Sequence, residues 1–181
     1  RSSRKKCPKS KPLKIVNTAL QLELARFNIH LGNRCLQTYA DPPEDPLNEL
    51  SAFELGIRRF CYDYNRPVDL EIGEERLQVF LDPDICMLLE DELPQKIVNL
   101  EKGQNLILDF CESESVTLSM VVEDATIDCC LRYFGDSVKE RRFTLDRDRV
   151  VMTLKLFLYQ VIANARDSSY ITSEETLDFL K

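Results

Sequence analysis

The sequence predicts an α+β fold: mainly an antiparallel β-meander sheet packed by α-helices, with a long buried C-terminal helix. Three segments, 105–112, 116–123 and 125–134, alternate apolar and polar residues between short polar turns, which is the pattern of a meander. After Asp146, apolar residues recur at helical spacing over a wide arc, which is typical of a helix buried against a sheet. A chain of 181 residues with 44% hydrophobic composition is long and apolar enough to bury a sizeable core.

Two helices are predicted before the first hairpin. Residues 13–37 fit either a helix or a strand, because apolar residues recur at helical spacing while part of the segment also alternates; the helix is favoured. In the proline-rich loop that follows, Asp45 before Pro46 has the pattern of an N-cap and a first-turn proline. The second helix is therefore expected to run from 46 to about 64, and Pro67 ends it.

A hairpin and a broken helix are expected next. Segments 68–72 and 76–81 alternate on either side of Gly73, which predicts two strands joined by a tight turn. A helix restarts at Pro83, and Pro94 is expected to break or kink it.

The C-terminal part begins with the meander and ends in helices. The middle meander strand is predicted to turn four apolar side chains to one face, and these are Val116, Leu118, Met120 and Val122. A short strand around Phe143 precedes the long helix, which Asp146 caps. Thr172 and Glu175 have capping-box spacing and predict a last short helix.

Charge divides the chain into two regions. Residues 1–14 hold seven basic and no acidic side chains, whereas residues 15–181 hold 17 basic against 31 acidic ones, a balance of −14. We therefore expect a basic N-terminal tail at 1–14 and a single acidic α+β domain at 15–181. The tail is interpreted as a lead without a specific role, with a localisation signal or a phosphate-contacting arm as alternatives.

The sequence contains few of the residue patterns from which known catalytic sites are built. A single histidine, His30, is expected to be structural, and glycines never closer than 17 residues apart exclude a P-loop or a dinucleotide fingerprint. Seven cysteines without a C-x-x-C pair indicate reduced thiols in a cytoplasmic protein, most of them small core residues. No cofactor, metal site or catalytic residue is predicted, and apolar runs are too short for a membrane span.

Two stretches carry only acidic charges, 82–92 and 109–128. A surface of one sign steers an oppositely charged partner, although the same residues also serve solubility alone. The acidic residues predicted to bind a partner are Glu90, Asp91, Glu92, Glu112, Glu114, Glu123 and Asp124.

A second candidate patch lies on the predicted helix 46–64. Spacing of four places Arg58, Tyr62 and Arg66 in one line opposite the apolar stripe, although a helix that ends at about 64 would leave Arg66 just past its end. A tyrosine between arginines has the composition of a binding hot spot. The competing interpretation is a solvated face on which the arginines pair with nearby acids.

These observations favour a non-enzymatic protein-interaction module: an adaptor, a regulatory subunit or an inhibitor or immunity-type protein that binds another, possibly basic, protein. The alternative is a nucleic-acid-associated protein that uses the tail and the strand at 139–149, where five basic residues are partly offset by acids. A hydrolase with a carboxylate site, such as Asp109 with Glu112, or with a cysteine is a third hypothesis. A cytoplasmic location is expected, or a nuclear one if the tail is an address.

Overall fold

Strands in the described part of the chain form two antiparallel sheets. The structure is a computed structural model that describes residues 23–37, 41–135 and 137–180. A three-stranded sheet has the order β1 (Phe27–Leu31), β2 (Pro67–Ile72) and β3 (Glu75–Phe80). A four-stranded sheet has the order β4 (Leu106–Phe110), β5 (Val116–Glu123), β6 (Thr126–Tyr133) and β7 (Lys139–Asp146).

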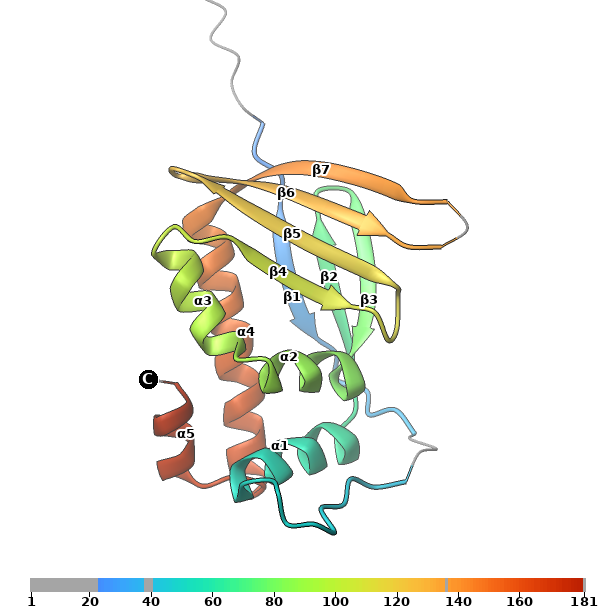
Figure 1. Ribbon diagram of the computed structural model, residues 1–181, viewed down its shortest axis with the longest axis vertical. Coiled ribbons are helices and arrows are strands. Elements are labelled where there is room, and N and C mark those ends of the chain that lie inside the picture. The colour runs from blue at the N-terminus through green and yellow to red at the C-terminus, as the bar shows by residue number, and fades with distance from the viewer. Residues whose placement is uncertain (1–22, 38–40, 136, 181) are drawn as a thin grey trace, which may run out of the picture.

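Helices lie along one side and at one end of the sheets (Figure 1). They are α1 (Ala52–Asp63), a π-helical turn η1 (Leu81–Ile85), α2 (Cys86–Glu90), α3 (Leu93–Glu101), α4 (Arg147–Asp167) and α5 (Ser173–Phe179). The long helix α4 packs against β1 of one sheet, β7 of the other and the neighbouring α3. The α+β fold with a long buried helix near the C-terminus is therefore confirmed.

The meander is confirmed as the four-stranded sheet, which continues into β7. On β5, Val116, Leu118 and Met120 are buried, Val122 is half-buried, and Val121 on the other face is exposed. The buried faces of both sheets contribute to one hydrophobic core, together with eight buried residues of α4. Alternation within each strand thus decides which side of each sheet the helices and the other sheet can cover.

The expected helix over 13–37 is wrong where the structure describes the segment, since Phe27–Leu31 is strand β1. This strand pairs in antiparallel register with β2, from Phe27 opposite Ile72 to Leu31 opposite Val68. Phe27 and Leu31 are buried while the residues between them are half-buried or exposed, so the alternating pattern describes the segment correctly. Pairing with β2 overrides the helical spacing, and residues 13–22 lie outside the described part.

The helix predicted from residue 46 begins six residues later, at Ala52. The Asp45 carboxylate accepts backbone hydrogen bonds from Glu49 (2.9 Å) and Leu50 (2.9 Å), so it closes a turn that does not continue as a helix. Ser51 is the true N-cap: its hydroxyl accepts from the Glu54 amide, and the Glu54 carboxylate accepts from the Ser51 amide. Asp45–Pro46 carries a similar local signal six residues earlier, so two starts compete in the sequence and the structure uses the later one.

Other local predictions are confirmed or shifted slightly. Asp146 caps α4 by accepting from the Arg149 amide, and Thr172 begins α5 with a capping box. Pro94 does not break a helix. The break lies just before it, where Glu92 adopts a left-handed conformation (φ 56°), and Pro94 stands in the first turn of α3, where proline is tolerated.

The two sheets meet at the β2–β3 hairpin. Gly73 turns this hairpin with φ +60°, and a Cβ added there would lie 2.7 Å from ring atoms of Phe143 on β7. Ala25, just before β1, forms a parallel bridge with Leu145 and donates its amide to the Thr144 carbonyl at 2.8 Å. The strand end and the hairpin turn of one sheet are therefore held against the edge strand of the other.

Candidate functional site

Two groups of residues that the sequence singled out separately meet at the helical end of the fold. The Arg58 guanidinium on α1 donates two hydrogen bonds to the Glu90 carboxylate at the end of α2, Nε to Oε1 at 2.5 Å and Nη2 to Oε2 at 3.3 Å. This carboxylate raises the pKa of Arg58. The bidentate geometry fixes the orientation of both side chains, although both are partly exposed and the solvent weakens the attraction.

A small hollow opens beside this ion pair, with a volume of about 230 Å³. Its lining combines an aromatic ring, a thioether, a thiol and charged groups: Asp41, Pro43, Arg58, Tyr62, Asp82, Pro83, Cys86, Met87 and Glu90. Met87 is 50% exposed, so a flexible apolar side chain stands at the surface. Aromatic, arginine and methionine side chains around a hollow have the composition of protein-binding hot spots.

The predicted line of three residues on α1 holds for two of them. Arg58 and Tyr62 line the same hollow, as their spacing of four predicts. Arg66 does not belong to the line, because α1 ends at Asp63 and the chain turns into β2. Its guanidinium lies over the Tyr64 ring instead, 5.9 Å from the centroid.

Two groups in or next to the hollow, the Cys61 thiol and the Asp82 carboxyl, have raised pKa values. The Cys61 thiol is buried on α1, and its hydrogen bond with Cys86 together with burial raises the pKa of Cys61. The Cys86 thiol donates to Glu90 Oε1 at 3.8 Å. Burial, and then the charges of Asp84 and Glu90, raise the pKa of Asp82. A thiol with a raised pKa is a poor nucleophile near neutral pH, so this arrangement favours packing over covalent chemistry.

The predicted acidic residues are divided among three places. Glu90 pairs with Arg58, Asp91 forms an ion pair with Lys96, and Glu92 is exposed at the start of α3, so these three neighbours lie at the α2–α3 junction. Glu112 and Glu114 lie in the β4–β5 turn. Glu123 and Asp124 lie in the β5–β6 turn, at the opposite end of β5. The two acidic stretches of the sequence are therefore separate in the fold, and the second is itself divided between the two ends of β5.

Ion pairs occupy the basic strand that was the candidate for phosphate contacts. On β7, Arg141 pairs with Glu75 (3.2 Å) and Arg142 with Asp128 (3.0 Å). Glu140 of the same strand pairs with Arg132 at 2.6 Å. These contacts favour local charge pairing for residues 139–149, while the tail at 1–14 lies outside the described residues.

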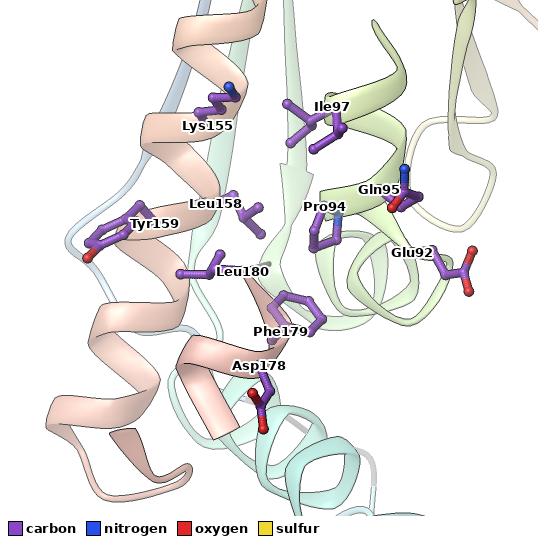
Figure 2. A pocket seen from close by; sticks show the side chains of 11 residues that line it. Glu92, Pro94, Gln95, Ile97, Lys155, Leu158, Tyr159, Asp178, Phe179 and Leu180 are labelled. Carbon is purple, nitrogen blue, oxygen red and sulfur yellow. The ribbon is translucent and has the colours of Figure 1, made fainter. Parts of the chain in front are cut away.

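The sequence did not reveal a larger hollow between α3, α4 and α5, with a volume of about 610 Å³. Figure 2 shows Ile97, Leu158, Phe179 and Leu180 converging on it from three helices. A neighbouring hollow of about 390 Å³ between α1, α2 and α5 shares Glu92 and Phe179 with it. The wide apolar arc of α4 indicates the wall that this helix contributes to the larger hollow. The other walls come from α3 and α5, and no pattern within α4 predicts them.

Several remaining predictions can be placed. His30 is exposed on β1. Of the cysteines in the described ranges, Cys61, Cys86 and Cys129 are buried, Cys130 is half-buried, and Cys35 and Cys111 are exposed. Asp109 accepts a hydrogen bond from Thr117 Oγ1 at 2.7 Å and one from the Cys111 thiol. Within residues 23–37, 41–135 and 137–180, three or more potential metal ligands are never grouped, and each helix is too short or too polar to cross a membrane.

Comparison with protein-family models, with curated proteins and with solved structures found no match to this chain.

Proposed function

We propose that this chain is a protein-interaction module that binds a basic partner protein with the helical end of its fold and performs no chemistry of its own. An adaptor, a regulatory subunit or an inhibitor would act in this way. The observation that carries the proposal is the Arg58–Glu90 ion pair, which brings the α1 patch and the acidic α2–α3 junction together around one hollow.

Charge supports a basic partner. The ionisable carboxyl groups that line the hollow are Asp41, Asp82 and Glu90, against the single guanidinium of Arg58. A lysine or arginine from a partner would gain from these carboxylates, while the Tyr62 ring and Met87 would supply apolar contact area. Interfaces of this kind combine a few anchoring side chains with a polar rim.

Affinity capture with the intact protein tests the proposal, using Tyr62→Ala and Met87→Ala as variants of the hollow. Ile107→Ala and Val121→Ala are matched controls, because both remove an exposed apolar side chain from the outer face of the four-stranded sheet. We expect a stoichiometric complex with a basic protein that weakens as salt rises from about 0.1 M to about 1 M. Either hollow variant should weaken it about tenfold or more, with the controls unchanged.

Three results would contradict the proposal: no protein retained at stoichiometric level, a complex equally weakened by the control substitutions, or turnover of a substrate by the purified chain. A tight complex that ignores salt would leave an interaction module but overturn the role of the acidic groups.

A further inference from the structure

We propose that the groove between α3, α4 and α5 is the docking site for a basic amphipathic helix of the partner protein; this inference rests on the proposed function. The groove comprises the hollow of about 610 Å³ and its neighbour of about 390 Å³. The two hollows share Glu92 and Phe179, so they border each other at the acidic α2–α3 junction. This places the groove next to the Arg58–Glu90 ion pair, since Glu90 also lines the smaller of the two hollows.

The floor of the groove is apolar and built by helices. Ile97, Leu158 and Leu180 line the larger hollow, and Ile57 and Leu89 line the smaller one. Phe179 stands between them, with its ring 4.7 Å from the Phe53 ring. A partner segment can therefore bury apolar side chains on either side of Phe179.

An exposed apolar stripe extends the groove along α4. Tyr159 lines the larger hollow and is 59% exposed (Figure 2). Met152 and Leu156 are exposed to a similar degree and lie seven and three residues before it, on the same face of the helix. Three large exposed apolar side chains at helical spacing favour an interaction site over a solvated face.

Charge around the groove identifies the partner chemistry. The charged side chains that line the two hollows are Glu54, Glu90, Glu92 and Asp178 on the acidic side and Lys155 on the basic side. Lys155 pairs with Glu101, Nζ to Oε2 at 2.6 Å, Glu90 pairs with Arg58, and Glu54 accepts from the Ser51 amide. In Figure 2, Lys155 lies at the upper left of the larger hollow, Glu92 at its right and Asp178 below it. Basic residues of the partner would therefore approach the sides at Glu92 and Asp178, away from Lys155.

Helical walls favour a helix as the occupant. A bound strand needs unpaired backbone groups at a sheet edge, whereas this groove is lined by side chains of helices whose backbone groups are paired internally. An amphipathic helix supplies anchors at positions i, i+3 or i+4 and i+7, which pack between the ridges of flanking helices. The apolar floor takes such anchors, and the acidic end selects lysine or arginine beside them.

A displayed library of helical peptides of about 20 residues, selected on the intact protein, tests the inference. We expect enriched peptides to share an apolar i, i+4, i+7 stripe with lysine or arginine near one end. Amide chemical shifts should change at Gln95, Leu158 and Phe179. Glu92→Lys, Asp178→Lys and Tyr159→Ala should each weaken peptide binding about tenfold. The matched control is Glu74→Lys, the same charge reversal at the exposed β2–β3 turn.

The outcomes separate this inference from the proposed function. The groove is contradicted as the docking site if the enriched peptides are acidic or lack an apolar stripe. It is also contradicted if they shift amides of the sheets, or if they bind the groove variants as tightly as the control variant. Binding of small apolar molecules alone, with no enriched peptide, also overturns it. If a captured partner is lost with Tyr62→Ala but retained with Glu92→Lys and Tyr159→Ala, the groove is not its docking site, while the proposed function is retained. If no partner is captured at all, the proposed function itself fails.

Discussion

The Ser113 hydroxyl donates a hydrogen bond to the buried Asp84 carboxylate and so ties the β4–β5 turn of one sheet to the π-helical turn that follows β3 of the other. Asp84 is only 2% exposed, and its Oδ2 atom also accepts from the Phe80 amide at 2.9 Å. One carboxylate thus satisfies a hydroxyl and a backbone donor at the place where the chain leaves the first sheet for the helices.

Replacing Asp84 should destabilise the fold strongly. Asp84→Ala leaves the Phe80 amide and the Ser113 hydroxyl without their acceptor, so we expect a loss of about 2–4 kcal/mol in the free energy of unfolding. Ser113→Ala should cost about 1 kcal/mol, because it removes a single donor. Urea denaturation measures both. The control is Asp148→Ala, whose side chain is 94% exposed; a loss for Asp84→Ala no greater than for this control would contradict the assignment.

Gly56 should not tolerate alanine. A Cβ at this position in α1 would lie 2.2 Å from the Tyr170 carbonyl oxygen, in the loop between α4 and α5. Overpacking of this kind costs about 1–3 kcal/mol, more than the roughly 1 kcal/mol that alanine gains over glycine as a helix former. We expect Gly56→Ala to lower the thermal midpoint. Gly135→Ala, where an added Cβ meets nothing within 4 Å, should leave the midpoint nearly unchanged.

The stability of Asp82 variants should depend on pH with a defined sign. Burial and nearby negative charge raise the folded-state pKa of Asp82 above its ordinary value of 3.8. A raised pKa means that the folded chain binds the proton more tightly, so the favourable contribution is complete below pH 3.8 and is lost as pH rises through the raised pKa. Asp82→Asn should therefore be more stable than the parent at pH 7, by at most about 1 kcal/mol after solvent screening.

Asp109 supplies a control of opposite sign. Hydrogen bonds from Cys111 and Thr117 lower the pKa of Asp109 below 3.8. Its contribution is therefore present above pH 3.8 and is lost as pH falls through the lowered pKa. Asp109→Asn should be less stable than the parent at pH 7, and both differences should shrink in acid. Equal pH profiles for the two variants would contradict the signs.

Cysteine reactivity should follow exposure and hydrogen bonding. Cys35 and Cys111 are exposed, whereas Cys61 and Cys129 are buried, and burial raises the pKa of Cys129 to about 12. The hydrogen bond to Asp109 raises the pKa of Cys111, which lowers its thiolate fraction. Timed iodoacetamide labelling with peptide mass spectrometry should find Cys35 and Cys111 modified before the buried pair. Asp109→Asn should accelerate Cys111 alone; an unchanged rate would argue against the hydrogen bond.

Features encoded within a few residues could be predicted from the sequence. The caps at Asp146 and Thr172 and the turn at Gly73 each depend on neighbours in the chain, and the structure confirms them. For strand β1 the sequence offers both a helix and a strand, because its apolar residues fit two periods, and pairing with the distant β2 decides between them against the favoured helix. The start of α1 was misplaced because two capping signals, at Asp45 and Ser51, lie six residues apart.

In the candidate site, too, features within one helix could be predicted from the sequence, whereas contacts between distant segments could not. Spacing on one helix is enough to place Arg58 beside Tyr62, and the expected helix end at about 64 agrees with α1 stopping before Arg66. The Arg58–Glu90 contact joins residues 32 positions apart on two helices, so no window of the sequence contains it. The groove could not be predicted either, because its walls come from three separate helices of the chain.

Helix α5 has a dynamic consequence for this surface. Its seven residues bury only Thr176, and it is held through the Phe179 ring against Phe53. Local unfolding begins where few buried contacts oppose it, so α5 should open more often than α4, with its eight buried residues. Because Phe179 and Leu180 are also walls of the groove, an occupant would hold α5 closed. Binding would then be recorded as slower hydrogen exchange in the final residues of the chain.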